Sequence, residues 1–301
     1  MPRSYAFVKL DVFTTVAFEG NPLAVFPDAQ GLDTATMQRV ACELNLSETT
    51  FVFPPADPEN TALVRIFTPR SELPFAGHPT VGTAFVLRGD GHADSLVLEE
   101  GVGPVPVRVA RADDGALRFW LTTPPITFGE RVDPAIVTRA LGLRPNDIQA
   151  DAPPEIVSAG APFIFVALKN RELVDRIEAL DYRALRAALP NAPTEVFVFA
   201  RLEESDDQPG DTYAVYSRMF APEIGIAEDP ATGGATGPLA AYMLRHGLLP
   251  LANGLHMVSE QGTKMGRRSL LHVLLHVDDD ALTRIEVGGS VVPIARGEMT
   301  L

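Results

Sequence analysis

The sequence predicts an α+β fold built from two similar halves, each wrapped around one apolar helix. Strands and helices follow one another without the regular βαβ alternation of a doubly wound parallel sheet. Two small-residue loops, at 77–79 (GHP) and 233–238 (GGATGP), each lead into a helix that is apolar on most faces and has a proline near its first position. Gly82 and Gly237 stand at matching places in these helices, about half of the 301-residue chain apart, which indicates an internal duplication.

Local patterns along the chain predict the individual elements. Residues 5–13 alternate apolar and polar side chains, as a half-buried strand does. Asp33 can cap a helix whose apolar stripe ends at Leu44, and Asp133 can begin another helix that ends at Gly142. Further strands are expected at 23–26, 51–53, 62–67, 163–168, 195–200 and 213–220, and in a series from 270 to the end of the chain.

The segment 123–134 (TPPITFGERVDP) is rich in proline and turn residues and is the expected boundary between the halves. The N-terminal half then comprises residues 1–122, with the C-terminal residues 288–301 as candidates to complete it, and the C-terminal half comprises 123–287. The acidic stretch 203–211 (EESDDQPGD) is expected to form a solvated hairpin loop.

Composition and charge exclude several classes of function. The chain has 25 basic and 39 acidic residues, a net charge of −14, which repels nucleic-acid backbones and anionic membrane surfaces. No stretch approaches the roughly 20 apolar residues that span a bilayer, and no apolar leader segment follows the first residues. Cys42 is the only cysteine, so an intrachain disulfide and a cysteine metal cluster are excluded. We therefore expect a cytoplasmic protein without a nucleic-acid or membrane partner.

Three features that could carry chemistry are better explained as structure. Residues 101–103 (GVG) begin like a dinucleotide-binding loop, but the prolines that follow prevent the helix that such a loop requires. His272 and His276 have the spacing of a helical metal pair, but they lie in a strand-like run, so no metal site is expected. Cys42 is assigned to the apolar stripe of its helix and therefore to the core.

Glu48, His78 and Asp229 are the candidate catalytic residues. Glu48 lies between a helix end and an apolar strand, where partial burial would let its carboxyl accept and return a proton near neutrality; a solvated loop carboxylate is the alternative. His78 can cap the helix that follows the first small-residue loop, and Asp229 can cap the helix that begins at Gly233, in each case with or without a role in chemistry. Together these residues describe two helix starts whose N–H groups could hold a carboxylate beside acid/base groups.

Eight stretches, spread in order over nearly the whole chain, form a recognisable set. They are 11–13 (DVF), 20–25 (GNPLAV), 44–49 (LNLSET), 65–69 (RIFTP), 72–80 (ELPFAGHPT), 228–233 (EDPATG), 261–262 (QG) and 265–267 (MGR). With these motifs the sequence resembles the PhzF-like family, named for phenazine biosynthesis, which shares the fold of the diaminopimelate epimerases.

The resemblance implies a fold, a site and an activity. The fold would be α+β, with two pseudo-symmetric halves, each a curved, mostly antiparallel sheet or barrel around a central helix, and the active site in the cleft between them. Glu48 would be the acid/base, with His78 and Asp229 beside the substrate. The substrate-binding residues would be Asn21, Gly77, Gly233 and Gly234. The protein would be a homodimeric isomerase that uses neither metal nor organic cofactor and moves a proton on a small carboxylate-bearing metabolite.

The chain departs from the family pattern within the expected site. Family members often carry serine where Gly234 stands, and the loss of that hydroxyl removes one hydrogen bond that a phenazine precursor could use. The related epimerases use two cysteines, whereas Ala76 and Ala231 occupy the corresponding positions here, so a two-thiol racemase mechanism is excluded. A non-catalytic protein that binds small acids, and an epimerase that uses Glu48 with a non-thiol partner, remain as alternatives to proton migration.

Overall fold

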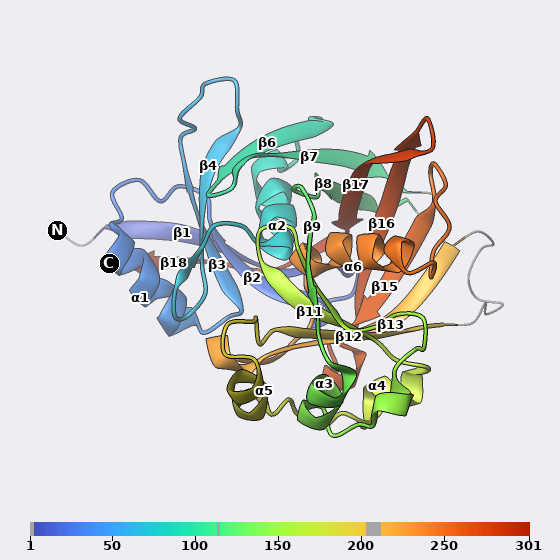
Figure 1. The fold of residues 1–301 in the computed structure, drawn as a ribbon. Coiled ribbons are helices and arrows are strands. Elements are labelled where there is room, and N and C mark those ends of the chain that lie inside the picture. Colours follow the sequence, from blue (N-terminus) through green and yellow to red (C-terminus); the bar gives the residue numbers. More distant parts are fainter. Residues whose placement is uncertain (1–2, 113–114, 203–211) are drawn as a thin grey trace. The chain divides into compact units, whose positions relative to one another are not determined.

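The computed structural model describes residues 3–112, 115–202 and 212–301. The acidic stretch 203–211, expected to form a hairpin loop, lies outside the described residues. Within the described part of the chain, no helix is long and apolar enough to cross a membrane. The chain divides by its internal packing into two compact units, and each unit is a mostly antiparallel sheet with a few helices (Figure 1). The mixed α and β class predicted from the sequence is confirmed.

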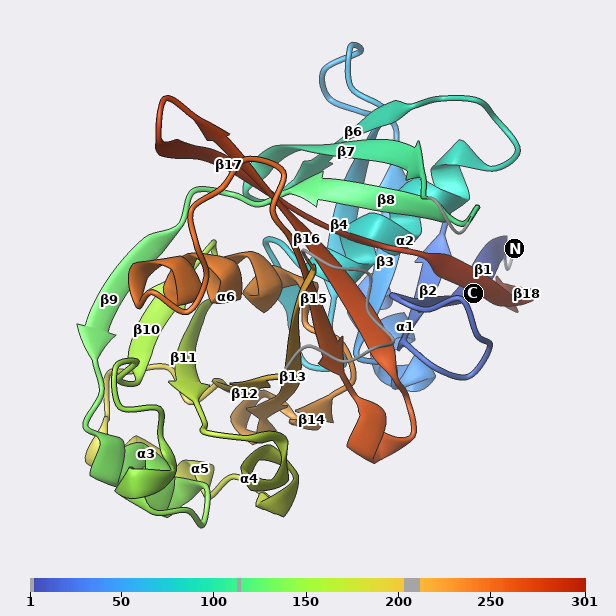
Figure 2. The same ribbon diagram turned by 90° about the vertical axis from the view of Figure 1, so that its right-hand side faces the viewer.

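The first unit consists of Met1–Thr122 and Gly288–Leu301. Its helices are α1 (Thr34–Leu44) and α2 (Gly77–Arg88), and its strands are β1 (Ser4–Val12), β2 (Asn21–Phe26), β3 (Glu48–Phe53), β4 (Ala62–Phe67), β5 (Glu72–Leu73), β6 (Ser95–Glu100), β7 (Gly103–Arg111), β8 (Leu117–Thr122) and β18 (Val291–Thr300). β18 pairs antiparallel along the whole of β1, so the C-terminal residues lie beside the N-terminal strand (Figure 2). From β1 the sheet continues through β2, β3, β4, β6, β7 and β8, and it is antiparallel except at the β2–β3 and β4–β6 pairs.

Helix α2 is the central helix of this unit. It packs against β1, β2, β3, β6, β7, β8 and β18, and its residues from Gly77 to Ala84 are all buried. Gly82 allows this close approach, because a Cβ at that position would lie 2.5 Å from Cδ2 of Leu23. A helix surrounded by a sheet must be apolar on most of its faces, which is the pattern that the sequence carries.

The second unit, Thr123–Val287, is also a sheet with one buried helix. Its helices are α3 (Pro134–Ala140), α4 (Arg171–Arg176), α5 (Tyr182–Ala188) and α6 (Gly233–Arg245), and its strands are β9 (Thr127–Arg131), β10 (Glu155–Ser158), β11 (Pro162–Ala167), β12 (Val196–Arg201), β13 (Thr212–Ala221), β14 (Ile226–Asp229), β15 (His256–Gln261), β16 (Ser269–Asp278) and β17 (Ala281–Gly289). The sheet runs from β9 through β10, β11, β12, β13 and β15 to β16, with β11–β12 and β13–β15 parallel. The buried helix α6 packs against β10, β11 and β16.

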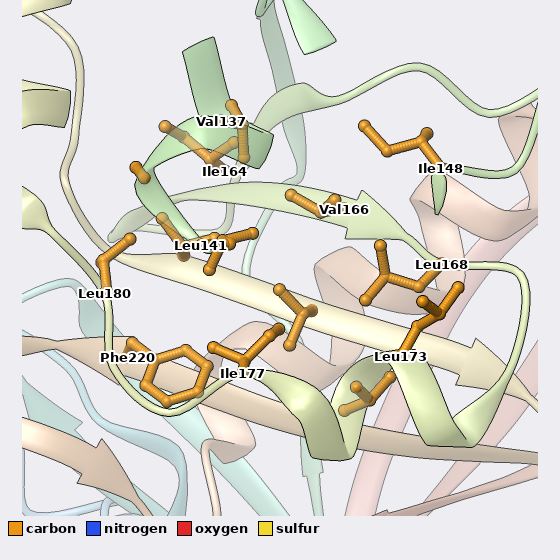
Figure 3. Close-up of a cluster of buried hydrophobic side chains, with 14 of the residues drawn as sticks. Val137, Leu141, Ile148, Ile164, Val166, Leu168, Leu173, Ile177, Leu180 and Phe220 are labelled. Atoms are coloured by element: carbon orange, nitrogen blue, oxygen red, sulfur yellow. The ribbon is translucent and has the colours of Figure 1, made fainter. Parts of the chain in front are cut away.

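Strand β11 is covered on both of its faces. Ile164 and Val166 point into a cluster of buried apolar side chains that joins the strand to α3, α4 and the segment after α4 (Figure 3). Phe165, between them, points the other way and contacts the ring of Tyr242 in α6, with 5.8 Å between ring centroids. Because successive strand residues face opposite sides of a sheet, burial on both sides requires the unbroken apolar run of β11.

The structure corrects three details of the elements predicted from the sequence. Cys42 is exposed, because the buried stripe of α1 is formed by Met37, Val40 and Ala41 and each further residue turns about 100° around the helix. Pro238 lies inside α6 and not at its start. The short helices α4 and α5 were missed because six or seven residues are too few to display a helical period.

Candidate active site

Glu48 is the first residue of β3 and is buried, with 8% of its surface exposed. Asn45, the C-cap of helix α1, adopts the left-handed conformation (φ 49°, ψ 39°) and turns the chain toward the strand. β3 then runs parallel to β2, with Glu48 opposite Leu23. The alternative of a solvated loop carboxylate is therefore wrong, because β3 begins before the apolar run 51–53 and takes Glu48 into the sheet.

His78 is buried beside Glu48. Its Nε2 lies 3.2 Å from Oε2 of Glu48, and 3% of the residue is exposed. Burial lowers the pKa of His78 to about 3, because the imidazolium ion loses its hydration. A neutral imidazole can donate a hydrogen bond from one ring nitrogen and accept one at the other. His78 therefore faces the Glu48 carboxyl as a neutral ring that does not take up its proton.

The start of α2 places His78 two residues further into the helix than the sequence suggested. Ala76 is the N-cap, with extended backbone angles (φ −154°, ψ 135°) and no side-chain cap, so the prediction that His78 caps the helix is wrong. The first N–H groups of a helix are not used by the helix itself, and Pro79 has none to offer. Gly77 and His78 therefore supply the N–H donors of this first turn.

Asn21 and Thr49 bring further polar groups into the interior of the first unit. Asn21 is the first residue of β2, opposite Val12 of β1, and is fully buried. Thr49 is also fully buried, and its Oγ1 has no hydrogen-bond partner among the residues that the structure describes. Asn21, a predicted substrate-binding residue, thus lies on the strand that pairs with the start of β3.

Asp229 is the last residue of β14 in the second unit, and it is buried. The N-cap of α6 is Thr232, so the prediction that Asp229 caps this helix is wrong. Asp229 instead accepts a hydrogen bond at Oδ2 from Oγ1 of Thr232, at 2.6 Å. The N–H groups of Gly233 and Gly234, the first two residues of α6, are the unused donors of its first turn.

Gln261 forms hydrogen bonds to the loop from Asp229 to Thr232, here called the Asp229 loop. The sequence did not reveal this role. Its Nε2 donates to the backbone oxygen of Asp229 at 2.8 Å and to Oγ1 of Thr232 at 2.9 Å, and its Oε1 accepts from the N–H of Thr232 at 3.1 Å. Gly262 follows with a left-handed φ of 75°, and a Cβ there would lie 2.6 Å from the backbone oxygen of Pro230. The QG motif was the available signal, but its contacts depend on β15 lying beside this loop.

Groups of side chains suited to a metal ion are not found in the described ranges, where no three of His, Cys, Asp or Glu come together. His272 and His276 both lie in β16, where a spacing of four residues separates them by about 13 Å. His272 lies against His256, with 3.0 Å between ring nitrogens, and His276 lies 2.9 Å from Glu286. Residues 101–103 turn β6 into β7, so they form no nucleotide-binding loop.

Comparison with known proteins gives a family match that spans all the motifs found in the sequence. The model of the phenazine biosynthesis-like protein family (PhzC-PhzF) matches residues 10–297. The chain belongs to the PhzF-like family. Trans-2,3-dihydro-3-hydroxyanthranilate isomerase of Pseudomonas fluorescens is 37% identical, and the match covers 98% of this chain and 99% of that protein.

Solved structures place the PhzF-like chain among related folds. The phenazine biosynthesis protein of the PhzF family from Bacillus anthracis superposes with a TM-score of 0.86 at 25% identity, covering 99% of this chain and all of that one. A hydroxyproline epimerase from Agrobacterium vitis has a TM-score of 0.67 at 15% identity, covering 99% of this chain and 93% of that one, a likeness of fold alone. Several relatives that match this chain over nearly their full length are named isomerases. This PhzF-like chain is therefore an enzyme of the isomerase class.

Proposed function

We propose that this PhzF-like protein moves a proton on a small carboxylate-bearing metabolite, with Glu48 as the acid/base and without a metal or organic cofactor. The observation that carries the proposal is the contact between two buried groups, Oε2 of Glu48 and Nε2 of His78, at 3.2 Å. A general acid or base must be held within hydrogen-bond reach of the proton that it transfers, and a neighbouring ring can hold the carboxyl in place. Membership of a family of isomerases supports the same reaction class.

In the proposed reaction, the Glu48 carboxylate removes a proton from an acidic C–H of the substrate. The resulting acid, whose proton can exchange with solvent, gives a proton to another carbon of the same molecule, so the double-bond system shifts and no redox partner is needed. His78 stays neutral, since its pKa is about 3, and orients the Glu48 carboxyl. Asp229 is proposed as a further catalytic group, held by Thr232 and Gln261.

The substrate is proposed to be an aromatic or cyclic amino-acid-like carboxylate. Each helix start, with N–H groups from Gly77 in α2 or from Gly233 and Gly234 in α6, by itself suits a carboxylate because helix starts carry partial positive charge. Asn21 adds an amide that can both donate and accept. The relative from Pseudomonas fluorescens acts on a dihydro-hydroxyanthranilate by its name, but Gly234 offers no hydroxyl here, so a substrate with fewer polar groups is favoured.

The test is a screen of small amino and aromatic acids in D₂O, with NMR detection of deuterium bound to carbon. We expect wild-type protein to incorporate deuterium into its substrate, and Glu48→Gln, which keeps the shape but cannot take up a proton, to lose at least about a hundredfold in rate. Glu43→Gln, at an exposed position on α1, is the matched control and should exchange at the wild-type rate. Turnover by Glu48→Gln at the wild-type rate would exclude this mechanism.

The products of the same reaction separate the alternatives. Deuterium at a second carbon indicates migration of the proton, whereas inversion at the original carbon indicates an epimerase that uses Glu48 with a non-thiol partner. Binding without exchange at any carbon would indicate a protein that kept the fold and lost the chemistry. Since the pKa of His78 is about 3, the imidazole should add no acid limb to the rate near pH 6.5.

A further inference from the structure

Glu100 is a second buried carboxyl of the first unit, and the proposed reaction does not use it. It is the last residue of β6, with 8% of its surface exposed. Oγ1 of Thr80 lies 2.6 Å from its Oε1, while its Oε2 has no hydrogen-bond partner within the described ranges. Thr80 lies two residues after His78 in α2. The carboxyl therefore touches the helical turn that carries His78.

The hydroxyl of Thr80 lies within hydrogen-bond distance of two oxygens. Oγ1 of Thr80 also lies 2.8 Å from the backbone oxygen of Ala76, the N-cap of α2. A hydroxyl has one proton, so it cannot donate to both this carbonyl oxygen and an ionised Glu100. If Glu100 is protonated, it donates to Thr80 and Thr80 donates to Ala76, and both short contacts become hydrogen bonds.

Burial acts in the same direction as this proton count. It raises the pKa of Glu100 to about 8, and the bond with Thr80 offsets only part of that effect. Burial is the largest cause of the shift. The titratable groups on the elements packed against β6 are His78 and Arg88 on α2, Arg65 on β4, and Arg108 and Arg111 on β7. Glu100 is therefore a neutral acid at pH 7.

We propose that Glu100, as a neutral acid, is a positioning residue that fixes the first turn of α2 through Thr80 and Ala76 and so holds His78 against Glu48. Ala76 has no side-chain cap, and this chain of contacts ties the helix start to β6. The role in turnover rests on the proposed function; the tie itself does not. When Glu100 ionises, the hydroxyl of Thr80 turns from Ala76 to the carboxylate, and the helix start loses one of its bonds.

The decisive experiment follows the ring of His78 by NMR in protein labelled with ¹⁵N-histidine, without substrate. His78→Asn identifies the signal. Although the ring itself stays neutral, its signal should shift in one step with an apparent pKa near 8, as Glu100 ionises. Glu100→Gln cannot ionise and can still donate to Thr80, so the step should disappear.

The matched control is Glu99→Gln. Glu99 is adjacent on β6 but accepts hydrogen bonds from Ala56, Asp57 and Asn60 instead of α2, so the step should remain. A His78 signal that stays flat up to pH 10 in wild-type protein, or a step that survives in Glu100→Gln, would overturn the proposal.

Activity provides the second readout. The wild-type kcat should fall about tenfold for each pH unit above 8, because the active form needs a protonated Glu100. Glu100→Gln should keep kcat across that range with KM little changed, and an alkaline limb retained in this variant contradicts the positioning role. If Glu48→Gln turns over normally, the proposed function fails, whereas the His78 titration is measured without substrate and stands or falls separately.

Discussion

Gly237→Ala tests whether α6 is held as closely as the structure indicates. Gly237 is buried within α6, and a Cβ there would lie 2.6 Å from Cγ2 and 3.0 Å from Cβ of Thr123, with Oγ1 of Thr123 closer still. Rotating Thr123 does not relieve this contact, because a β-branched side chain exchanges one heavy atom for the other. The backbone of Thr123 is held by the bond from its N–H to the oxygen of Ile285, at 2.9 Å.

The expected cost follows from two opposing effects. Overpacking a core costs about 2 kcal/mol, while alanine in place of glycine within a helix gains about 1 kcal/mol. Gly237→Ala should therefore lower the free energy of unfolding by about 1 kcal/mol. In a Thr123→Ala background, which removes both clashing atoms, the same change should instead be stabilising.

A double-mutant cycle in urea, with equal m-values in all four proteins, measures this coupling, expected at about 2 kcal/mol. Gly82→Ala is the comparison in the first unit. Its nearest contact is the end of the flexible Leu23 side chain, at 2.5 Å, so its cost should be smaller. Equal effects of Gly237→Ala in both Thr123 backgrounds would refute the close contact.

Three further predictions concern single side chains. The pKa of Glu100 is about 8 in the folded protein, against 4.5 for an unperturbed glutamic acid. The free energy of unfolding should therefore fall as the pH rises between these values, by about 3 kcal/mol at pH 7. Glu100→Gln should remove this pH dependence when urea unfolding is compared at pH 5 and pH 7. Gln261→Ala loses the bonds to Asp229 and Thr232, and it should lower the free energy of unfolding by about 2 kcal/mol as well as kcat. An unchanged free energy of unfolding would show that the Asp229 loop does not depend on Gln261. Cys42 is exposed and should react with a thiol reagent in the native protein as fast as in urea.

Local signals in the sequence were sufficient where a neighbour along the chain supplies the partner. Asp33 caps α1 through the N–H of Thr36 at 2.7 Å, and Asp133 caps α3 through the N–H of Ala135 at 2.8 Å, both as expected. The apolar run 163–168 predicted β11 correctly, because a strand that is buried on both faces has no polar position.

Local signals in the sequence did not identify the capping residues of α2 and α6, because each loop offers more than one position at which the helix could begin. His78 and Asp229 are both suitable capping residues by type, yet Ala76 and Thr232 cap α2 and α6. The cap is the residue whose backbone is still extended when the helix begins, and packing of α2 and α6 into their sheets sets that point. Side-chain type at the two loops could not have shown it.

The sequence by itself determined the family, the α+β class and the identity of Glu48 and His78 as candidates, because apolar periodicity and short motifs are local properties of the chain. Only the tertiary structure decided that these two side chains meet at 3.2 Å, that Glu100 lies on Thr80, and that Gln261 holds the Asp229 loop. Each of these contacts joins residues 20 or more positions apart in the chain. Burial sets the protonation of His78 and Glu100, and burial is a property of the packed sheet around them, which no local pattern contains.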